Sequence, residues 1–511
     1  MSGIERLGPD VGRVALLGAA ATRRREAAAL AAVAPFALMA HAGDAVARLA
    51  LAVAPHARHV LVFAGPGNNG GDGIEAATRL CAMGKRASVL RVGANAKLPA
   101  DAAQALARAR AAGVDISEWQ DGSALPVDGV DLVVDALLGI GLARAAAGEI
   151  ADAIARIAEL AARGAHVLAV DVPSGLDVDR GQPIGAAVVA DDTLTLIAPK
   201  PGLFTGNGRD HAGRVWCARL GIDDAIGDPD AWLVGTRDPS CAAMPRRHAA
   251  HKGSFGDVAV VGGAPGMEGA AWLAARAAHA AGAGRVYLEL LRGDAARSTH
   301  DGFDPTRPEL MLRPGWSSGD AAIVQASTVV CGCGGGDAVR AALPRLLSLA
   351  PRLVVDADAI TAIAADASLL ALAVARESRG LATILTPHPL EAARLLGSTT
   401  AAVQSDRVDA AREIAVRCRA VVVLKGSGTV VAASGAVPRI NATGSAALAS
   451  AGTGDVLAGW IGGLWAADAA PALEIATRGV VEHGAAVEPG RAGATRAADL
   501  IEAMHRRARG A

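Results

Sequence analysis

The sequence predicts an α/β protein whose two halves are each built around a parallel sheet. Short β-rich apolar runs alternate with longer segments of Ala, Leu and Arg along the chain, which is the pattern of βαβ units. The 511 residues provide enough chain for two large α/β units. Between residues 221 and 251 the chain is rich in Asp, Pro and Arg and lacks periodicity. We therefore place a boundary there and predict domains at residues 1–238 and 239–511.

Composition and charge exclude several classes of protein. Lys and Arg total 50 and Asp and Glu total 51, and this balance disfavours a protein that coats nucleic acid. A hydrophobic fraction of 52 % excludes wholesale disorder, and an aromatic fraction of 3 % disfavours a stacking platform for single-stranded nucleic acid. The six scattered cysteines indicate thiols in a reducing compartment. With no long apolar run and no signal-peptide pattern, we expect a cytoplasmic homo-oligomer without a membrane or nucleic-acid partner.

Runs rich in β-branched and apolar residues mark the strands that we expect in each half. In the first half these are His59–Ala64, Ala87–Val92, Asp131–Asp135, His166–Val172 and Asp192–Ile197. In the second half they are Asp257–Val261, Arg285–Leu290, Thr328–Cys331, Leu353–Asp356, Ala382–Thr386, Ala420–Leu424 and Thr429–Ala432. Helical patterns separate them, such as Ile74–Met83, which Gly84 is expected to end.

The first expected strand runs directly into a glycine-rich segment, GPGNNGGDG, at residues 65–73. Its glycines match the GxGxxG pattern, in which the backbone approaches a ligand and a helix N-terminus holds a phosphate. A dehydrogenase of this type also needs an acidic residue after the next strand, where residues 93–95 are GAN, so hydride transfer is disfavoured. A plain glycine turn stays open as an alternative, although Asn68, Asn69 and Asp72 supply more polar groups than such a turn requires.

Two further strands of the first half are predicted to end in polar residues. Asp135 precedes the glycine loop LLGIGL, and Asp171 and Ser174 lie in the segment VDVPSGLD. Because the carboxyl ends of parallel strands lie along one edge of a sheet, we expect these side chains to converge with Asn69 and Asp72. Together they offer oxygen ligands for a hard cation and a carboxylate for proton transfer. Each aspartate alone is better explained as a helix cap, so the prediction of a site rests on their occurring together at one sheet edge.

These motifs, with LMAHAG at residues 38–43 and APKPGL at residues 198–203, resemble the NAD(P)H-hydrate epimerase family. The resemblance implies a Rossmann-like fold and interconversion of the R and S epimers of hydrated NADH or NADPH. It implies a potassium ion held by Asn69, Asp135 and Ser174, and it makes Asp171 our candidate acid or base. The substrate-binding residues that it implies are Asn68, Asn69, Gly70, Gly71, Asp72, Gly139, Ile140, Gly141, Leu142, Ala143, Arg144, Ala145 and Asp171.

In the second half, the segment SAGTGDVLAG at residues 450–459 precedes an apolar helical pattern. Small residues expose backbone N–H groups at a helix N-terminus, which is a ready site for an anion. Asp455 is expected in the first turn, where the helix dipole and the amides keep it ionised. A carboxylate there can take the proton of a hydroxyl that attacks a phosphate. An aspartate that only stabilises the helix start remains an alternative.

Other segments of the second half point to the same pocket. KGSGT at residues 425–429 forms a glycine turn between two expected strands and carries Lys425, one of only five lysines in the chain. A hairpin turn explains the glycines but not this lysine. TPHPLE at residues 386–391 ends a strand, opens a helix and places His388 there, although a lone histidine carries little information. DAD at residues 356–358 ends another strand and supplies further carboxylates.

These pieces and the segments HKGSFGDVAVVGG, NATG and AGTGDVLAG occur in the order typical of the ADP- or ATP-dependent NAD(P)H-hydrate dehydratase family, which they resemble. The resemblance implies a ribokinase-like fold, Mg²⁺ that accompanies the nucleotide, and Asp455 as the catalytic base. It implies nucleotide contacts from Lys425, Gly426, Ser427, Gly428, Thr429 and Gly454. It implies contacts to the hydrated nicotinamide from Ala270, Gly334, His388 and Asp455.

The two resemblances together predict a bifunctional repair enzyme for nicotinamide nucleotides. The first domain epimerises hydrated NAD(P)H, and the second dehydrates the S epimer to NAD(P)H with ADP, giving AMP and phosphate. One alternative is a ribokinase-like kinase for a small-molecule alcohol, which a stable phosphorylated product would favour. The other is a first domain that binds without catalysis, which binding of hydrated NADH without epimerisation would favour.

Overall fold

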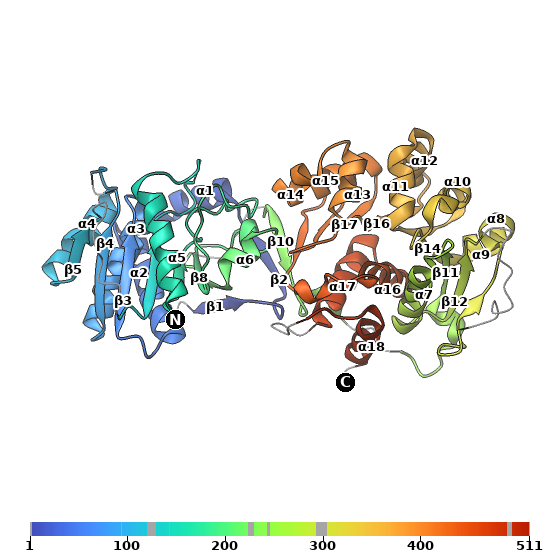
Figure 1. The fold of residues 1–511 in the computed structure, drawn as a ribbon, viewed down its shortest axis with the longest axis horizontal. Helices are drawn as coiled ribbons and strands as arrows, with labels where there is room; N and C mark the ends of the chain where they lie inside the picture. The colour runs from blue at the N-terminus through green and yellow to red at the C-terminus, as the bar shows by residue number, and fades with distance from the viewer. Residues whose placement is uncertain are drawn as a thin grey trace. The chain divides into compact units, whose positions relative to one another are not determined.

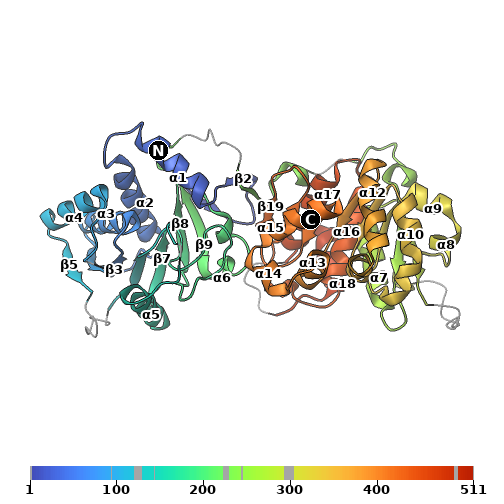
Figure 2. The ribbon, with the colours of Figure 1, turned by 90° about the horizontal axis from the view of Figure 1, so that it is seen from above.

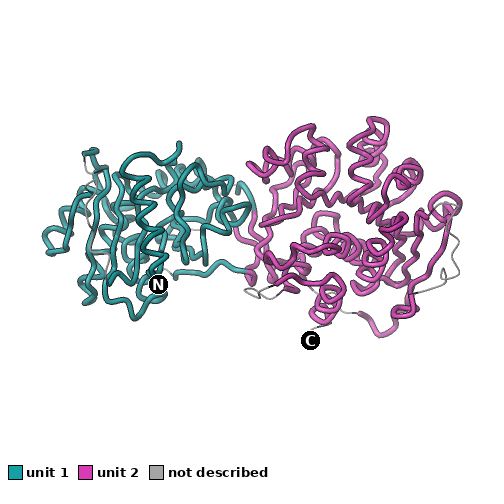
Figure 3. Tube along the Cα trace, in the orientation of Figure 1, with its two compact units in different colours: residues 1–8, 15–231 teal, residues 9–14, 232–511 magenta. Residues whose placement is uncertain are grey.

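A computed structural model describes residues 3–93, 95–119, 129–142, 144–222, 229–242, 246–292, 304–487 and 493–509. The chain forms two compact units, residues 1–8 with 15–231 and residues 9–14 with 232–511 (Figure 3). Both units have the α/β architecture that the sequence predicts. The boundary that we place between residues 238 and 239 stays a prediction.

The first unit contains a mostly parallel sheet of eight strands in the order β1-β9-β8-β7-β6-β3-β4-β5. The stretch β5-β4-β3-β6-β7-β8 has the 3-2-1-4-5-6 order of dinucleotide-binding domains, so the predicted Rossmann-like fold is confirmed. Only β1 runs antiparallel to its neighbour among the described pairs of this sheet. The strands are β1 (Ile4–Leu7), β3 (His59–Ala64), β4 (Arg86–Arg91), β5 (Asp115–Glu118), β6 (Leu132–Ala136), β7 (His166–Val170), β8 (Asp192–Leu196) and β9 (Arg214–Ala218).

Helices cover both faces of this sheet because its central strands are apolar on both sides. Val60 and Val62 of β3 pack on one face, whereas Leu61 and Phe63 pack on the other. Figure 2 shows α2 to α4 on one side of the sheet and α5 on the opposite side. The order of strands reverses between β3 and β6, which is where ligands bind in such sheets. The helices are α1 (Ala19–Leu30), α2 (Ala37–Val53), α3 (Asn68–Ala82), α4 (Ala100–Ala111), α5 (Glu149–Ala162) and α6 (Gly208–Ala212).

One boundary in this unit differs from the sequence prediction. Helix α3 begins at Asn68, so residues 68–73, which were expected to form a loop before Ile74, are helical. The reason is close packing: a Cβ on Gly70 would lie 2.0 Å from the carbonyl oxygen of Gly65. The helix ends as predicted, and Gly84 follows it with a φ of 82°.

The second unit is built on an eleven-stranded sheet in the order β13-β12-β11-β14-β15-β16-β17-β18-β19-β10-β2. Strands β11 to β17 pair in parallel, and β18 is antiparallel to β17. Figure 1 shows α7 and α16 to α18 on one side of this sheet and α10 to α15 on the other. The strands are β2 (Arg13–Leu16), β10 (Ala231–Val234), β11 (Asp257–Gly262), β12 (Arg285–Leu290), β13 (Met311–Leu312), β14 (Ser327–Cys331), β15 (Arg352–Val355), β16 (Ala382–Leu385), β17 (Val421–Leu424), β18 (Val430–Ala432) and β19 (Arg439–Asn441).

The helices of the second unit include α16, whose apolar side packs on α7 and on the valines of the central strands. Among the described helices none is both long and apolar enough to cross a membrane alone, and the bent pair α11 and α12 qualifies only by length and composition. All six cysteines are free thiols. The helices are α7 (Glu268–Ala280), α8 (Trp316–Gly319), α9 (Ala321–Ala326), α10 (Val339–Leu349), α11 (Ala357–Ala365), α12 (Ala367–Ser378), α13 (Pro389–Leu396), α14 (Thr400–Ser405), α15 (Arg407–Cys418), α16 (Thr453–Ala467), α17 (Ala472–Ala485) and α18 (Ala497–Ala508).

Candidate functional site

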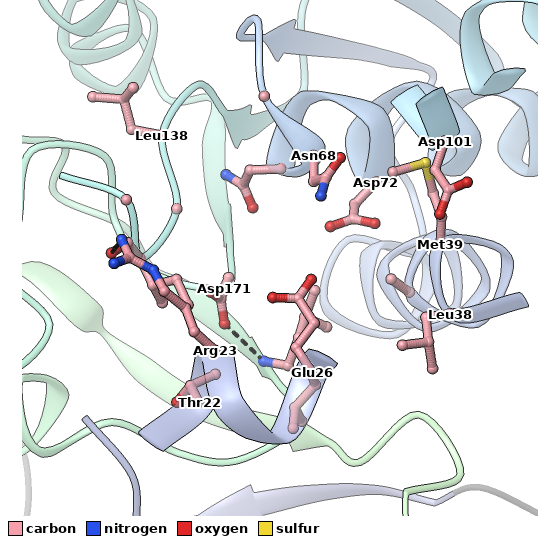
Figure 4. A pocket seen from close by; sticks show the side chains of 18 of the residues that line it. Thr22, Arg23, Glu26, Leu38, Met39, Asn68, Asp72, Asp101, Leu138 and Asp171 are labelled. Atoms are coloured by element: carbon pink, nitrogen blue, oxygen red, sulfur yellow. Dashed lines mark hydrogen bonds between the residues drawn. The ribbon is translucent and has the colours of Figure 1, made fainter. Parts of the chain in front are cut away.

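A cavity of about 420 Å³ lies in the first unit at the carboxyl ends of β3, β6 and β7 (Figure 4). It lies at the carboxyl edge of the sheet, as the sequence argument expects, and at the point where the strand order reverses. Gly70, Gly71, Arg144 and Ala145 are not among the described residues that line it, and Ala143 lies outside the described residues. Eight residues that the sequence singles out do line it, namely Asn68, Asn69, Asp72, Gly139, Ile140, Gly141, Leu142 and Asp171.

The two glycines outside the cavity lining shape the wall of the cavity instead. Gly70 packs against the backbone of Gly65, and a Cβ on Gly71 would lie 2.9 Å from the Cβ of Ala102. Without side chains, these glycines let the start of α3 approach the sheet and α4. They therefore position Asn69, which lies between Asn68 and Gly70 in the same turn of α3.

Asp135 and Ser174, two of the three residues predicted to hold potassium, form a buried hydrogen-bonded pair. Ser174 Oγ donates to Asp135 Oδ1 at 2.6 Å, and the Ser174 amide donates to Asp135 Oδ2 at 2.8 Å. Both residues are fully buried, and burial raises the pKa of Asp135 to about 6. Asn69 lies against Gly139, and its side-chain Nδ2 and Oδ1 are buried without a hydrogen-bond partner. An unsatisfied buried amide oxygen, a buried carboxylate and a hydroxyl are the oxygen ligands that a monovalent cation takes, so the chemistry of the three residues fits one.

Asp171 is held rigidly at the edge of the cavity. Its φ is 66°, a left-handed conformation that is unusual for a residue other than glycine. Lys200 Nζ donates to Asp171 Oδ1, and so does the amide of Leu196 at 3.0 Å. Lys200 is fully buried and also donates to Thr195 Oγ1 at 3.0 Å. Lys200 of the APKPGL segment is thus the counter-ion of Asp171. The sequence alone assigns no role to this lysine.

Two more carboxylates face Asp171 across the cavity. Burial, and then the charges of Asp171, Glu26 and Asp101, raise the pKa of Asp72 well above its usual value. Burial and then the charge of Asp171 also raise the pKa of Glu26. Sequence reasoning missed Glu26, although one signal was available: it is the only acidic residue between Asp10 and Asp44.

The second unit brings Asp455 together with residues at the ends of neighbouring strands. One oxygen of Asp455, one oxygen of Asp356 and the Sγ of Cys333 lie within 4.8 Å of one another. Lys425 Nζ donates to Asp356 Oδ1 at 2.7 Å and Thr386 Oγ1 donates to it at 2.6 Å, so the charge of Asp356 is paired. Burial, and then the charge of Asp356, raise the pKa of Asp455 to about 6. From the sequence we expect Asp455 to stay ionised at the helix start, without this rise in its pKa, which arises because desolvation outweighs the dipole.

The predicted nucleotide segment lies beside the start of α16. A Cβ on Gly454 would lie 3.3 Å from Lys425 Nζ, so the lysine and the predicted anion site are neighbours. Arg407, buried in α15, donates from Nη2 to the carbonyl oxygens of Leu424 and Lys425, both at 3.1 Å. Burial lowers the pKa of Arg407 to about 10. Sequence reasoning missed this residue, because nothing in its local sequence distinguishes it from the many other arginines.

The turn after Lys425 presents exposed backbone. Gly426 and Ser427 are exposed. Gly426 and Gly428 have φ values of 134° and 58°, and a residue with a side chain would be strained in this backbone conformation. Thr429 Oγ1 donates to the carbonyl oxygen of Gly426 at 3.0 Å and closes the turn. The five predicted residues of this segment therefore form one small loop next to the anion site.

The remaining predicted residues of the second site fall into two places. The amide of Lys425 donates to the Pro387 carbonyl at 2.9 Å, which places His388 beside this loop. The His388 ring caps α13 by accepting from two backbone amides, both at 3.2 Å, and its side chain is 45 % exposed. A Cβ on Gly334 would lie 2.9 Å from the Cβ of Ala270, so these two residues adjoin each other.

The folds and sites are those of an α/β protein with two candidate centres, a carboxylate-lined cavity in the first unit and Asp455 beside Lys425 at the start of α16 in the second. The chain matches the models of the YjeF-related protein N-terminus over residues 35–202 and of NAD(P)H-hydrate dehydratase over residues 258–506. It is 37 % identical over 476 residues to the bifunctional NAD(P)H-hydrate repair enzyme of Escherichia coli (strain K12), covering 91 % of this chain and 87 % of that protein. It is 36 % identical over 489 residues to the enzyme of the same name from Leishmania major, covering 88 % and 84 %. The chain therefore belongs to the family of bifunctional NAD(P)H-hydrate repair enzymes.

Two solved structures are similar to the second unit. One is the ADP/ATP-dependent NAD(P)H-hydrate dehydratase from Bacillus subtilis co-crystallised with ATP and Mg²⁺, at 26 % identity and a TM-score of 0.41, covering 52 % of this chain and 93 % of that one. The other is a ribokinase-like superfamily protein from Enterococcus faecalis V583, at 20 % identity and a TM-score of 0.44, covering 53 % and 93 %.

Proposed function

We propose that the first unit epimerises hydrated NADH or NADPH and that the second unit dehydrates the S epimer to NAD(P)H with ADP, giving AMP and phosphate. The observation that carries this proposal is the presence, in one chain, of a carboxylate-lined cavity and of Asp455 beside the start of α16. Damage produces both epimers, and a dehydratase that takes one of them needs an epimerase to clear the other. The homo-oligomer, the cytoplasmic location and the absence of membrane or nucleic-acid partners stay predictions from the sequence.

In the first unit, the hydrated ring would lie in the cavity against Asn68, Asp72 and Asp171. Asn69, Asp135 and Ser174 would hold potassium, which supplies a fixed positive charge near the nucleotide. The orphaned amide of Asn69 supports this assignment. Asp171, anchored by Lys200, acts as the acid or base at the hydroxyl-bearing carbon.

In the second unit, Asp455 takes the proton of the substrate hydroxyl as that oxygen attacks the terminal phosphorus of ADP. The bond from phosphorus to AMP breaks, and loss of the new phosphate with a proton from the adjacent carbon restores the double bond. Mg²⁺ supplies charge neutralisation on the phosphates, and it travels with the nucleotide because a thiol such as Cys333 is a poor ligand for it. Lys425 lies beside the anion site and is placed to contact the transferred group.

Asp135→Ala is expected to weaken potassium activation of epimerisation and to leave dehydration of pure S substrate unchanged. Loss of about 1.4 kcal/mol of cation binding raises the half-activating potassium concentration about tenfold. The measurement is a potassium titration of both activities on one preparation, with exposed Asp115→Ala in the same sheet as the control. Equal loss of both activities would show that the two sites do not belong to separate units.

The kcat/KM of dehydration is expected to rise with pH through about 6 and to level off above it. The sign follows from the role of Asp455: its pKa is raised to about 6, and only the ionised form accepts a proton. The measurement is a pH profile of dehydration with pure S substrate. The rise of kcat/KM through about pH 6 should be present in the wild type and absent from Asp455→Asn. A flat profile between about pH 5 and 7 in the wild type would contradict the assignment of the base.

Mass spectrometry of the products tests the proposed function against the kinase alternative. The second unit is expected to yield NADH, AMP and phosphate from hydrated NADH and ADP, with no accumulation of a phosphorylated alcohol. A stable phosphorylated product without NADH would overturn the dehydratase assignment and favour a ribokinase-like kinase.

A further inference from the structure

Glu26 places a fourth carboxylate in the cavity of the first unit, besides Asp72, Asp101 and Asp171, from an element that none of the predicted motifs includes. It lies on α1, which precedes the match to the family model at residues 35–202. Figure 4 shows the side chains of Glu26, Asp72 and Asp171 extending toward the same open space, from α1, from the start of α3 and from the end of β7. The three carboxylates therefore enter this space from three different elements rather than from one side of it.

The charged groups around Glu26 lie on α1, α3 and α4 and after strands β7 and β8. Asp171 lies after β7 with Lys200 as its counter-ion, Asp72 lies on α3 and Asp101 on α4. On α1 itself, Arg23 donates from Nη2 to the Ile140 carbonyl at 3.2 Å and is turned toward the glycine loop. Burial and then Asp171 raise the pKa of Glu26, whereas Lys200 and Arg23 oppose this shift less strongly. The pKa of Glu26 therefore lies above that of an ordinary glutamate, and the neighbouring Asp171 is paired with Lys200.

Inverting the hydrated carbon of the substrate requires both a proton donor and a proton acceptor. Water adds to the enamine of a dihydronicotinamide at the carbon bonded to the ring nitrogen, which gives a carbinolamine. If an acid protonates this hydroxyl, the C–O bond breaks, water leaves, and the nitrogen lone pair forms a planar iminium ion. A water molecule that adds to the opposite face and gives a proton to a base completes the inversion. One water leaves and one enters, and no oxidant or reductant is needed.

We propose that Glu26 is a second catalytic residue of the epimerase, which protonates the departing hydroxyl while Asp171 takes the proton of the entering water. This inference rests on the proposed function of the first unit. In the reverse direction the two residues exchange roles, and proton exchange with solvent resets them. Glu26 suits this exchange because it is only half-buried, whereas Asp72 belongs to the helix turn that shapes the cavity wall.

The test compares Glu26→Gln and Glu26→Asp with the wild type on purified R substrate. Epimer ratios are followed by chromatography and corrected for the spontaneous reaction. Glu26→Gln is expected to lower kcat by about 10² to 10⁴-fold with KM nearly unchanged, and Glu26→Asp is expected to retain more activity because it keeps an acid. Arg24→Gln, an exposed change on the same helix, is expected to behave as the wild type.

Two further readouts separate a catalytic role from a structural one. The wild-type kcat should fall as pH rises through the pKa of Glu26, since the donor is then lost, and this limb should be absent from Glu26→Gln. In water labelled with oxygen-18, each wild-type epimerisation should place one solvent oxygen on the product, a result that does not depend on any variant folding.

Three outcomes would overturn the inference. They are a Glu26→Gln enzyme with kcat within about threefold of the wild type, a change confined to KM, or epimerisation without solvent oxygen in the product. A wild-type chain that binds hydrated NADH and does not epimerise it would overturn the proposed function of the first unit itself, and the inference with it.

Discussion

Asp455→Asn is expected to lower dehydration turnover by about 10² to 10⁴-fold while ADP binding survives. The substitution keeps the size of the side chain and its place in the first turn of α16, and it removes only the proton acceptor. Nucleotide binding rests on the amides at the start of α16 and on the loop at residues 425–429, which the change does not touch. ADP affinity by calorimetry and dehydration by the absorbance of reduced nicotinamide should be measured on one preparation.

Asp356 and Asp358 are two other carboxylates that could act as the base in place of Asp455. Asp356 accepts hydrogen bonds from Lys425 and Thr386, and Asp358 accepts one from the amide of Gly336 at 2.9 Å. Both carboxylates are therefore engaged by these donors, whereas the side-chain partner of Asp455 is the thiol of Cys333. If Asp455→Asn binds ADP normally and turns over within about threefold of the wild type, Asp455 is only a helix cap. Epimerase activity is the internal control and should not change.

Lys200→Met is expected to destabilise the first unit by about 3–5 kcal/mol and to abolish epimerisation. The ammonium is fully buried and bonded to Asp171, whose side chain is only 12 % exposed. Removing it leaves a desolvated carboxylate without a counter-ion, and the carbonyl of Leu196 loses a donor at 2.8 Å. Hydrogen exchange in β7 and β8 reports the local stability, and dehydration of pure S substrate should be unaffected.

Two variants make this prediction specific. Lys97→Met removes an exposed lysine of the same unit and should change neither exchange nor activity. Asp171→Asn combined with Lys200→Met removes both charges and should recover much of the exchange protection without recovering epimerisation. Unchanged protection in Lys200→Met would show that the buried pair does not stabilise the end of β7.

Most of the sheets could be predicted because their strands are short apolar runs with turn residues on both sides. All twelve expected strands are present within two residues of the predicted bounds. Two of the missed strands lie at sheet edges and give a weak signal, because β5 has one apolar residue in four and β13 is only two residues long. The start of α3 was misplaced because its glycines, usually helix breakers, are helical here to allow close packing. Such packing is a tertiary effect that local propensity does not contain.

The candidate sites were predictable where the residues lie at strand ends. Asp72 and Asp171 line one cavity as expected, and Asp135 is bonded to Ser174 near the same edge, since one edge of a parallel sheet collects the strand ends. Glu26 was not predictable in this way, because the face that α1 turns to the cavity depends on how that helix packs. The raised pKa of Asp455 was missed for a similar reason, since desolvation and the charge of Asp356 arise only in the folded chain.

The central claim is that one chain carries both activities, and a single incubation tests it. An equimolar mixture of R and S hydrated NADH is given to the full chain with ADP, Mg²⁺ and potassium, over a time in which the mixture without enzyme epimerises little. The account predicts that absorbance of reduced nicotinamide rises until both epimers are consumed, and that Asp171→Asn stops at the S half. A wild-type reaction that also stops at half, or that consumes ADP without forming NADH, would contradict it.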